Sequence, residues 1–290
     1  MNDTEYSAQT DRFVHERLPS IEQRPRMLFE APELQFEPRL NVVHELLDKA
    51  PQKGFGERAM LRSDALTLTY AQAREQVDRM AQVLVEDFAL VPGNRVLLRG
   101  GNSIGMALAW LAVVKAGLVA VATMPLLRAK ELGDIIDKSQ PTLALCDARL
   151  LDELQQAQAQ HPVLRSVLAF QVAGVPAAPV SAPAVALEPL MADKSGVFDA
   201  CPTAATDVAM LAFTSGTTGK PKAAVHTHRD VLAACEAWPR HVLRATPEDI
   251  VMGSPPLAFT FGLGGMLVFP MWAGASVYFP SIAYTPQTVA

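Results

Sequence analysis

Residues 212–228, AFTSGTTGKPKAAVHTH, decide how the rest of the chain is interpreted. The central part, residues 214–222, carries four hydroxyl side chains, two glycines, two lysines and one proline. Glycines leave successive backbone N–H groups free to converge on an anion, and hydroxyl and ammonium groups add further donors. The apolar residues just before this stretch predict a buried strand over 207–213. A polar, glycine-containing loop after a buried strand indicates a binding site for a polyphosphate.

The Walker A loop of kinases and GTPases, G-x-x-x-x-G-K-[ST], fits this stretch poorly. The residue five before Gly219 is Thr214 where glycine is needed, and Lys220 is followed by Pro221 where Ser or Thr is needed. Pro221 also biases Lys220 away from helical backbone, so the loop cannot pass straight into a helix. A kinase with an unusual loop is therefore kept only as a second class of enzyme, which an experiment has to exclude.

The chain before the loop alternates between amphipathic helices and short apolar strands. One helix opens at Thr69 and Tyr70 and keeps an apolar face as far as Phe88, and a second, with Asn102 and Ser103 as capping candidates, runs to Lys115. Further helices are expected over 129–139 and 148–160. Strands are expected over 95–99, 119–123, 142–146 and 166–170. This order predicts an α/β fold with mainly parallel sheets and helices on both faces.

Composition divides the chain into four segments. Residues 1–40, rich in Pro, Glu and Arg, are expected to wrap over the surface, and residues 41–170 form a first α/β subdomain. Residues 171–205 are an Ala/Pro-rich surface connection or loosely ordered linker. Residues 206–290 start a second α/β subdomain with a helix near 228–243, a strand over 250–254 and an apolar segment over 262–278. The closing TPQTVA is typical of a first helical turn, so we expect the chain to have been cut.

Charge and cysteine content exclude several classes of protein. The chain has 290 residues, half of them hydrophobic, and 25 basic against 30 acidic residues with no Lys/Arg-rich run. We therefore expect a globular protein that binds neither nucleic acid nor an anionic membrane. Cys146, Cys201 and Cys235 stand singly, which favours buried or free thiols over a metal site or disulfide. The polar N-terminus, MNDTEYSAQTDRF, is not a secretory signal, so a cytoplasmic location is expected.

The stretch MALAWLAVVKAGLVAVATMPLL, residues 106–127, is long enough to cross a bilayer if it forms one helix. Lys115 lies near its middle, Gly117 follows, and residues 119–123 are rich in β-branched side chains. These features favour a buried helix, a tight turn and a buried strand over a membrane span.

The loop resembles the phosphate-binding signature of the adenylate-forming superfamily, which includes acyl-CoA synthetases, peptide adenylation domains and luciferases. That signature reads aromatic-T-S-G-S/T-T-G-x-P-K-G, and residues 213–222 match every defined position; Ala223 departs from the usual glycine without removing a phosphate donor. LTYAQAREQVDRMAQVL, VLLRGGNS, LAWLAVVKAGLVAVATMPLL and IIDKSQPTLALCD are similar to the family's N-terminal subdomain in the same order. The resemblance covers the chain from about residue 40 to 290 and implies an incomplete N-terminal large domain.

A second segment, SPPLAFTFGLGGMLVFPMWAGA, is similar to the acyl-pocket segment of benzoate- and aminobenzoate-CoA ligases. Many fatty-acid, acetate and coumarate ligases carry a histidine beside the aromatic residue there, whereas this chain has Ala258, Phe259, Thr260 and Phe261. Phe259, Phe261 and Gly262 are therefore expected to bind a flat aromatic acid. The opening LPSIEQRPRMLFEAPELQFEPRLN favours aminobenzoate.

The resemblance implies ATP, Mg²⁺ and coenzyme A as co-substrates. The residues implied in phosphate binding are Thr214, Ser215, Gly216, Thr217, Thr218, Gly219 and Lys222. Lys220 occupies a variable position and is expected to face solvent, and His226 and His228 are expected to be structural, with His228 satisfying backbone groups at a helix start. The family's magnesium-binding glutamate, ribose-binding aspartate and catalytic lysine lie C-terminal to the acyl-pocket segment, so neither a catalytic residue nor a metal ligand is expected within residues 1–290.

The implied reaction joins a carboxylate to ATP, forming an acyl-adenylate and pyrophosphate, and then transfers the acyl group to the thiol of coenzyme A. We expect the parent protein to be an aryl-CoA ligase, with little or no turnover by this chain alone. A ligase of another acid class, a non-catalytic nucleotide-binding domain and an atypical kinase remain alternatives. A kinase would release ADP where a ligase releases AMP. A homodimer through an exposed apolar face is left open.

Overall fold

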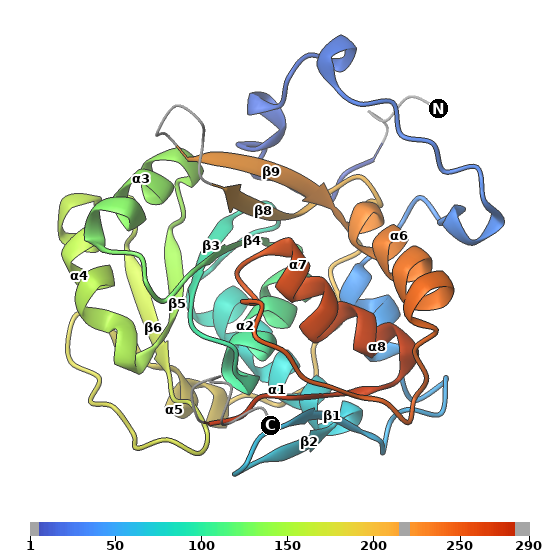
Figure 1. Ribbon diagram of the computed structural model, residues 1–290. Coiled ribbons are helices and arrows are strands. Elements are labelled where there is room, and N and C mark those ends of the chain that lie inside the picture. Colours follow the sequence, from blue (N-terminus) through green and yellow to red (C-terminus); the bar gives the residue numbers. More distant parts are fainter. Residues whose placement is uncertain (1–5, 215–220, 282–290) are drawn as a thin grey trace.

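The computed structural model describes residues 6–214 and 221–281 (Figure 1). The helix start expected in TPQTVA lies outside these residues. The helices are α1 (Tyr70–Gln82), α2 (Ile104–Lys115), α3 (Ala129–Ser139), α4 (Leu151–Gln160), α5 (Leu187–Ala192), α6 (His228–Trp238), α7 (Thr260–Leu263) and α8 (Phe269–Ala273). The strands are β1 (Ala59–Arg62), β2 (Thr67–Thr69), β3 (Arg95–Arg99), β4 (Val119–Thr123), β5 (Leu143–Asp147), β6 (Ser166–Phe170), β7 (Val185–Ala186), β8 (Val208–Thr214), β9 (Lys222–Thr227), β10 (Ile250–Val251) and β11 (Ser276–Tyr278). Short 3-10 or π turns are η1 (His15–Arg17), η2 (Ile21–Gln23), η3 (Pro32–Leu34), η4 (His44–Asp48), η5 (Val83–Asp87), η6 (Ala148–Leu150), η7 (Pro239–Leu243) and η8 (Gly264–Val268).

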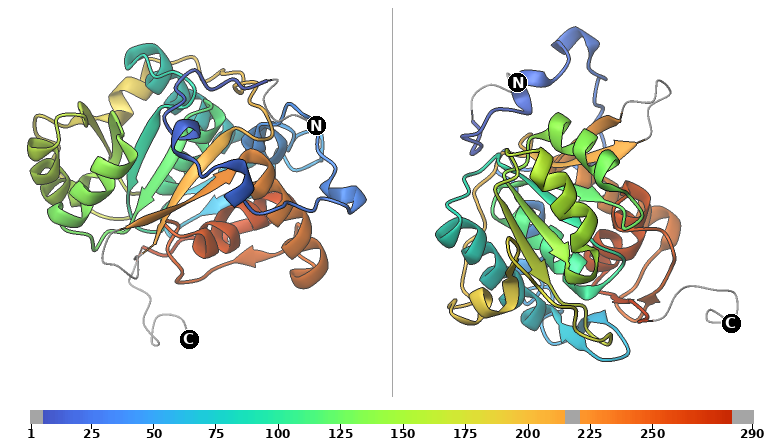
Figure 2. Two further views of the ribbon diagram at one scale, coloured as in Figure 1. Left: turned by 90° about the horizontal axis from the view of Figure 1, so that it is seen from above. Right: turned by 90° about the vertical axis from the view of Figure 1, so that its left-hand side faces the viewer.

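A seven-stranded sheet with the order β7-β6-β5-β3-β4-β8-β9 organises the molecule. Every neighbouring pair is parallel except β8 and β9, which pair antiparallel. Val96 and Leu98 of β3 join the apolar cluster that contains α1 and α2, whereas Leu97 joins the cluster of α3 and α4. Because side chains alternate across a strand, the two helix pairs cover opposite faces (Figures 1 and 2). The predicted α/β fold with mainly parallel strands is confirmed.

Local hydrogen bonds explain where the first two long helices begin. At α1 the Gln72 N–H donates to Thr69 Oγ1 at 3.2 Å, and the Thr69 N–H donates to Gln72 Oε1 at 2.9 Å, which is a complete capping box. At α2 the cap is Ser103, whose Oγ accepts from the Met106 N–H at 3.2 Å. Asn102, the other capping candidate, bonds elsewhere.

The stretch over 106–127 is not one helix. It divides into most of α2, a turn at Gly117 with φ of +73°, and β4. A left-handed backbone at that point suits glycine and ends the helix. No helix in the described part of the chain has both the length and the apolarity needed to cross a membrane.

A smaller sheet, with the order β10-β11-β1-β2, joins distant parts of the chain. Leu61 of β1 lies beside Val277 of β11 in parallel register. The N-terminal segment runs over the surface, where the Gln9 side chain donates to the Val208 carbonyl at 2.7 Å and Ser7 and Ala8 bond the Asp207 carboxylate. Strands from residues 41–170 and from residues 206–290 thus share both sheets, and the subdomain boundaries stay predictions.

Several local predictions were wrong. No strand was predicted over residues 222–227 or 59–69. The first range forms β9, and the second forms the β1–β2 hairpin. The strand expected over 250–254 contains only Ile250–Val251, whereas the helix predicted near 228–243 is confirmed, because α6 continues into the π-helical η7. The 171–205 connection includes β7 and α5 with buried Leu187 and Met191. For each prediction that was wrong, partners far along the chain supply the pairing or packing, which local patterns do not reveal.

The cysteines behave as predicted. Cys146 and Cys235 are buried, Cys201 is half-buried, and all three are free thiols. Burial raises the pKa of Cys146 to about 12 and that of Cys201 to about 11. Both side chains are therefore protonated near neutral pH.

Candidate functional site

The polar loop joins β8 and β9, so its ends are fixed by a hairpin. Thr214, the last residue of β8, lies opposite Lys222, the first residue of β9. Opposite residues of an antiparallel pair project to the same face with Cβ atoms about 5 Å apart. The hairpin therefore brings these two predicted phosphate-binding side chains together. The other predicted loop residues, Ser215, Gly216, Thr217, Thr218 and Gly219, lie outside the described residues, as does Lys220.

Ala223, which stands where the signature has glycine, points away from Thr214 and Lys222. It lies opposite Phe213 and packs, like Phe213, against the apolar cluster of α3 and α4. Since side chains alternate along a strand, its methyl group lies on the face opposite to Thr214 and Lys222. The extra methyl group packs beside Phe213 and leaves the face that carries Thr214 and Lys222 unchanged.

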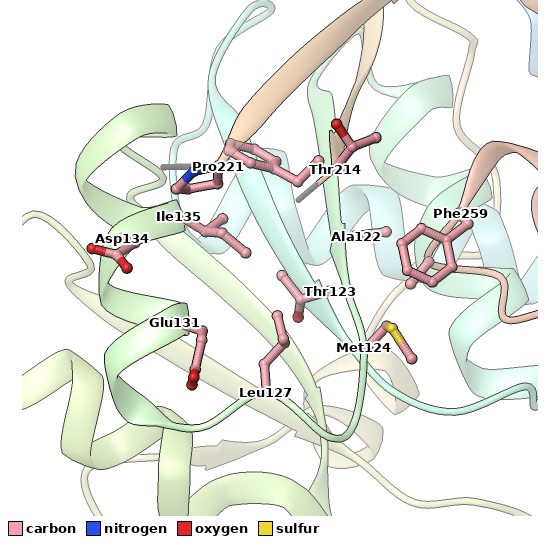
Figure 3. A pocket seen from close by; sticks show the side chains of 12 residues that line it. Ala122, Thr123, Met124, Leu127, Glu131, Asp134, Ile135, Thr214, Pro221 and Phe259 are labelled. Atoms are coloured by element: carbon pink, nitrogen blue, oxygen red, sulfur yellow. The ribbon is translucent and has the colours of Figure 1, made fainter. Parts of the chain in front are cut away.

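A cavity of about 600 Å³ opens beside the hairpin (Figure 3). Its wall comes from the ends of β4 and β8, from α3, and from the segment before α7. The lining residues are Ala122, Thr123, Met124, Leu127, Glu131, Asp134, Ile135, Phe213, Thr214, Pro221, Ala258 and Phe259. The wall is thus largely apolar, with Thr214 and Pro221 on either side of the polar loop at its edge.

The predicted acid-binding residues differ in their position. Phe259 lines the cavity and is 38% exposed, whereas Phe261 is 77% exposed and is not among the lining residues. Gly262 is buried at the start of α7, where a Cβ atom would come within 2.0 Å of the Pro256 carbonyl oxygen. Gly262 thus allows the chain before α7 to fold back closely.

Three polar lining residues were not found from the sequence: Thr123, Glu131 and Asp134. Glu131 caps its own helix, because its Oε2 accepts from the Arg128 N–H at 3.0 Å. These residues share the cavity wall with Thr214 because β4 lies beside β8 in the sheet, although Thr123 and Val208 at the start of β8 are 85 positions apart. The sequence shows that polar residues follow β4. It does not show that β4 lies beside β8, and only this strand order brings those residues to the cavity.

Of the two histidines after the loop, His228 has the structural role that was expected, and that of His226 stays a prediction. His228 is fully buried, and its Nδ1 accepts from the Val42 N–H at 3.2 Å. Burial lowers the pKa of His228 to about 3, so the ring is neutral, with the proton on Nε2. Burial also lowers the pKa of His226, although nearby Asp230 opposes the shift. Neither ring lines the cavity.

The described residues contain no group of three or more His, Cys, Asp or Glu side chains that could hold a metal ion. The hydroxyl group of Thr214 lines the cavity at the hairpin mouth, and the ammonium group of Lys222 belongs to the residue opposite it. Such donors suit an anion.

Comparisons with known proteins agree with this arrangement. The chain is 28% identical over 258 residues to a benzoate–CoA ligase of Thauera aromatica, covering 89% of this chain and 47% of that protein. It is 29% identical over 223 residues to an anthranilate–CoA ligase of Pseudomonas aeruginosa, covering 77% of this chain and 41% of that protein. The chain thus spans about half the length of these curated relatives.

The fold matches a crystal structure of the anthranilate CoA ligase AuaEII in complex with anthranoyl-AMP. The TM-score is 0.82 at 23% identity, covering 89% of this chain and 48% of that chain. The model of the AMP-binding enzyme family matches residues 47–289, which is most of the sequence. The resemblance inferred from the loop is thereby confirmed, and this chain belongs to the family of AMP-binding enzymes.

Proposed function

We propose that this chain provides the phosphate-binding and acid-binding parts of an AMP-forming aryl-CoA ligase, with 2-aminobenzoate or benzoate as the type of substrate. The observation that carries the proposal is the position of the cavity. One wall ends at Thr214 and Pro221, which flank the polar loop, while Phe259 and Met124 supply apolar surface on the other side. An anion held by the loop and a flat apolar ring held in the cavity would be neighbours.

The volume and lining support an aromatic acid. Ligand cavities of about 300–1,000 Å³ with mostly apolar walls and a few polar groups bind small organic molecules. At about 600 Å³ the cavity has room for a benzoate ring and part of a nucleotide. Aromatic and thioether side chains pack well against a ring face.

The chemistry follows from this proximity. A carboxylate oxygen of the acid attacks the α-phosphorus of Mg·ATP, and the bond to the β-phosphate oxygen breaks, which releases pyrophosphate. Held by the loop, the β- and γ-phosphates would be oriented as the leaving group, with Lys222 near their growing charge. The thiol of coenzyme A then attacks the acyl carbon, and AMP leaves. Mg²⁺ enters as part of the nucleotide substrate.

The test measures the release of pyrophosphate and AMP. The sample is the longest protein that can be expressed and that contains this 290-residue sequence. The panel contains 2-aminobenzoate, benzoate, acetate and a long-chain fatty acid, each with and without coenzyme A. We expect release that depends on an aryl acid. Release with only acetate or the fatty acid would move the proposal to another acid class, and no release with any acid would overturn it in favour of a non-catalytic nucleotide-binding domain.

Two further readouts separate the remaining alternatives. Formation of ADP instead of AMP would indicate a kinase. The 290-residue chain is assayed alongside the longer form, and we expect it to show little turnover because the resemblance assigns no catalytic residue to it. Equal rates for the two forms would contradict that expectation while leaving the ligase proposal intact.

A further inference from the structure

Strand β3 is fully buried, yet it begins with Arg95 and ends with Arg99. Charged side chains are rarely buried without partners, so each arginine requires an explanation. Arg99 is 1% exposed. Its guanidinium donates to four main-chain carbonyls: Leu150 at 3.2 Å, Met124 at 3.1 Å, Pro125 at 3.1 Å and Leu127 at 2.9 Å.

Three of these carbonyls belong to the loop that joins β4 to α3, residues 124–128. The side chains of Met124 and Leu127 from this loop line the cavity (Figure 3). Within the loop the Leu127 N–H donates to the Met124 carbonyl at 3.3 Å, and the Arg99 guanidinium adds donors to this carbonyl and to those of Pro125 and Leu127. The planar guanidinium, with five donors in a fixed geometry, thus holds one wall of the cavity in place.

A second part of the wall, the segment before α7, is held from the same turn. Three residues after Arg99, the Asn102 side chain donates from Nδ2 to the Pro255 carbonyl at 2.9 Å and accepts at Oδ1 from the Leu257 N–H at 2.8 Å. This pair of bonds fixes the chain immediately before Ala258 and Phe259, which line the cavity. Both walls are therefore attached to residues 99–102 at the carboxyl end of β3.

We infer that Arg99 and Asn102 are positioning residues that fix the relative position of these two wall segments of the acid cavity, and thereby its affinity for a flat aryl acid. The inference rests on the proposed function, because it assigns that cavity to the acid. Neither side chain lines the cavity, so both act through the main chain of other residues. A displacement of about 1 Å in a binding site is enough to lower a rate strongly, so loosened walls should weaken acid binding selectively.

The chain offers a matched control in Arg95. It is 5% exposed and also donates to carbonyls, those of Gly93, Ser139 and Gln140, at the other end of β3 and away from the cavity. Unlike Arg99, it also forms an ion pair, with Asp11. Arg95→Met and Arg99→Met therefore remove the same side chain from the same buried strand. Arg95→Met also breaks the ion pair with Asp11, so its loss of stability should be at least as large as that of Arg99→Met, and an effect on the cavity that only Arg99→Met shows is specific to Arg99.

The first measurement is equilibrium binding to the 290-residue chain. 2-Aminobenzoate, whose own fluorescence reports binding, is titrated with and without Mg·ATP, and Mg·ATP is titrated separately. In Arg99→Met and Asn102→Ala we expect the Kd for 2-aminobenzoate to rise by about tenfold or more, as for the loss of one or two hydrogen bonds, while the Kd for Mg·ATP changes less than about twofold. Arg95→Met should leave both constants within about twofold.

The second measurement needs no ligand. Amide hydrogen exchange should accelerate over residues 124–127 in Arg99→Met and over residues 257–259 in Asn102→Ala, and at neither place in Arg95→Met. Asn102→Asp keeps the acceptor for the Leu257 N–H and loses the donor to Pro255, so an intermediate effect on both readouts is expected. The inference is overturned if Arg99→Met and Asn102→Ala match Arg95→Met in binding and exchange.

The two measurements also separate this inference from the proposed function. If the unmodified chain binds no aryl acid, the acid assignment fails, and exchange alone then decides the structural part. Faster exchange confined to the two walls would keep Arg99 and Asn102 as positioning residues of this cavity for another ligand. Unchanged exchange would overturn both conclusions.

Discussion

The Thr214–Lys222 pair is the part of the predicted phosphate site that the hairpin holds directly. A hydrogen bond to a charged group contributes about 1.5–3 kcal/mol, so Lys222→Ala should weaken Mg·ATP binding by about 10- to 100-fold. Lys222→Arg should retain most of the affinity because the charge is kept. Lys220→Ala is the matched control, since Lys220 is expected to face solvent. Isothermal titration measures all three, and an equal loss in Lys220→Ala and Lys222→Ala would show that only net charge matters.

His228 predicts a pH dependence of stability. Its pKa is lowered to about 3 in the folded state by burial, against about 6.5 in the unfolded chain. Between these values the unfolded chain binds one more proton, so the free energy of unfolding falls as pH falls through this window, by up to about 1.4 kcal/mol per pH unit. His228→Gln keeps an acceptor for the Val42 N–H and does not titrate.

Urea unfolding at several pH values tests this expectation. From pH 6.5 to pH 4.5 the His228→Gln variant should gain about 2–3 kcal/mol relative to the unmodified chain. His226→Gln should gain less, because Asp230 opposes the shift of His226. A difference between His228→Gln and the unmodified chain that stays constant with pH would contradict the buried neutral ring.

At the scale of elements, Lys115 links three helical segments. Its ammonium group contacts Asp78 of α1, and Asp48 of η4 at 2.6 Å, and its side chain is 1% exposed. Burial raises the pKa of Asp78, and the neighbouring Lys115 opposes this shift. The ion pairs thus allow a lysine within the otherwise apolar helix α2, which the sequence showed as an anomaly at the centre of residues 106–127.

Lys115→Met should therefore be strongly destabilising, because it leaves two carboxylates without their cation. A loss of about 3–5 kcal/mol is typical when one partner of a buried pair is removed. Lys115→Met combined with Asp78→Asn should lose less, and the single variant should recover stability as pH falls and Asp78, whose pKa burial raises, gains a proton. Chemical unfolding of the single and double variants gives the coupling, and strictly additive losses would contradict the proposed link.

The helices and strands between residues 70 and 170 were predictable because each carries its own signal. Thr69 and Ser103 cap helices, Gly117 turns the chain, and the strands that follow are continuous apolar runs. Strand β9 was missed because its burial comes from pairing with β8, and the cavity was missed because the neighbouring positions of β4 and β8 are set by sheet order. In the candidate site, Phe259 was predictable from resemblance, whereas Arg99 and Asn102 act through main-chain contacts that only coordinates reveal.

At the scale of the whole molecule, residues 41–170 and residues 206–290 contribute strands to the same two sheets. Strand β1 pairs with β11 in parallel, with Leu61 opposite Val277, and the Arg62 side chain donates from Nε to Ser276 Oγ at 3.1 Å. In the larger sheet β4 pairs with β8. The N-terminal segment bonds Asp207 and Val208 at the start of β8. Shared sheets of this kind favour a single cooperative unit, although composition suggested a boundary near residues 171–205.

Tryptophan fluorescence can test this cooperativity. Trp110 is buried in α2, and Trp272 lies in α8, where its Nε1 donates to Glu236 at 2.9 Å. In variants that retain only Trp110 or only Trp272, the fluorescence and far-UV circular dichroism transitions in urea should coincide, because neither part can unfold without breaking the sheets of the other. Comparison within each variant removes the effect of the substitutions on stability. Two separate transitions, with Trp110 and Trp272 following different ones, would instead establish that residues 41–170 and 206–290 unfold as independent subdomains.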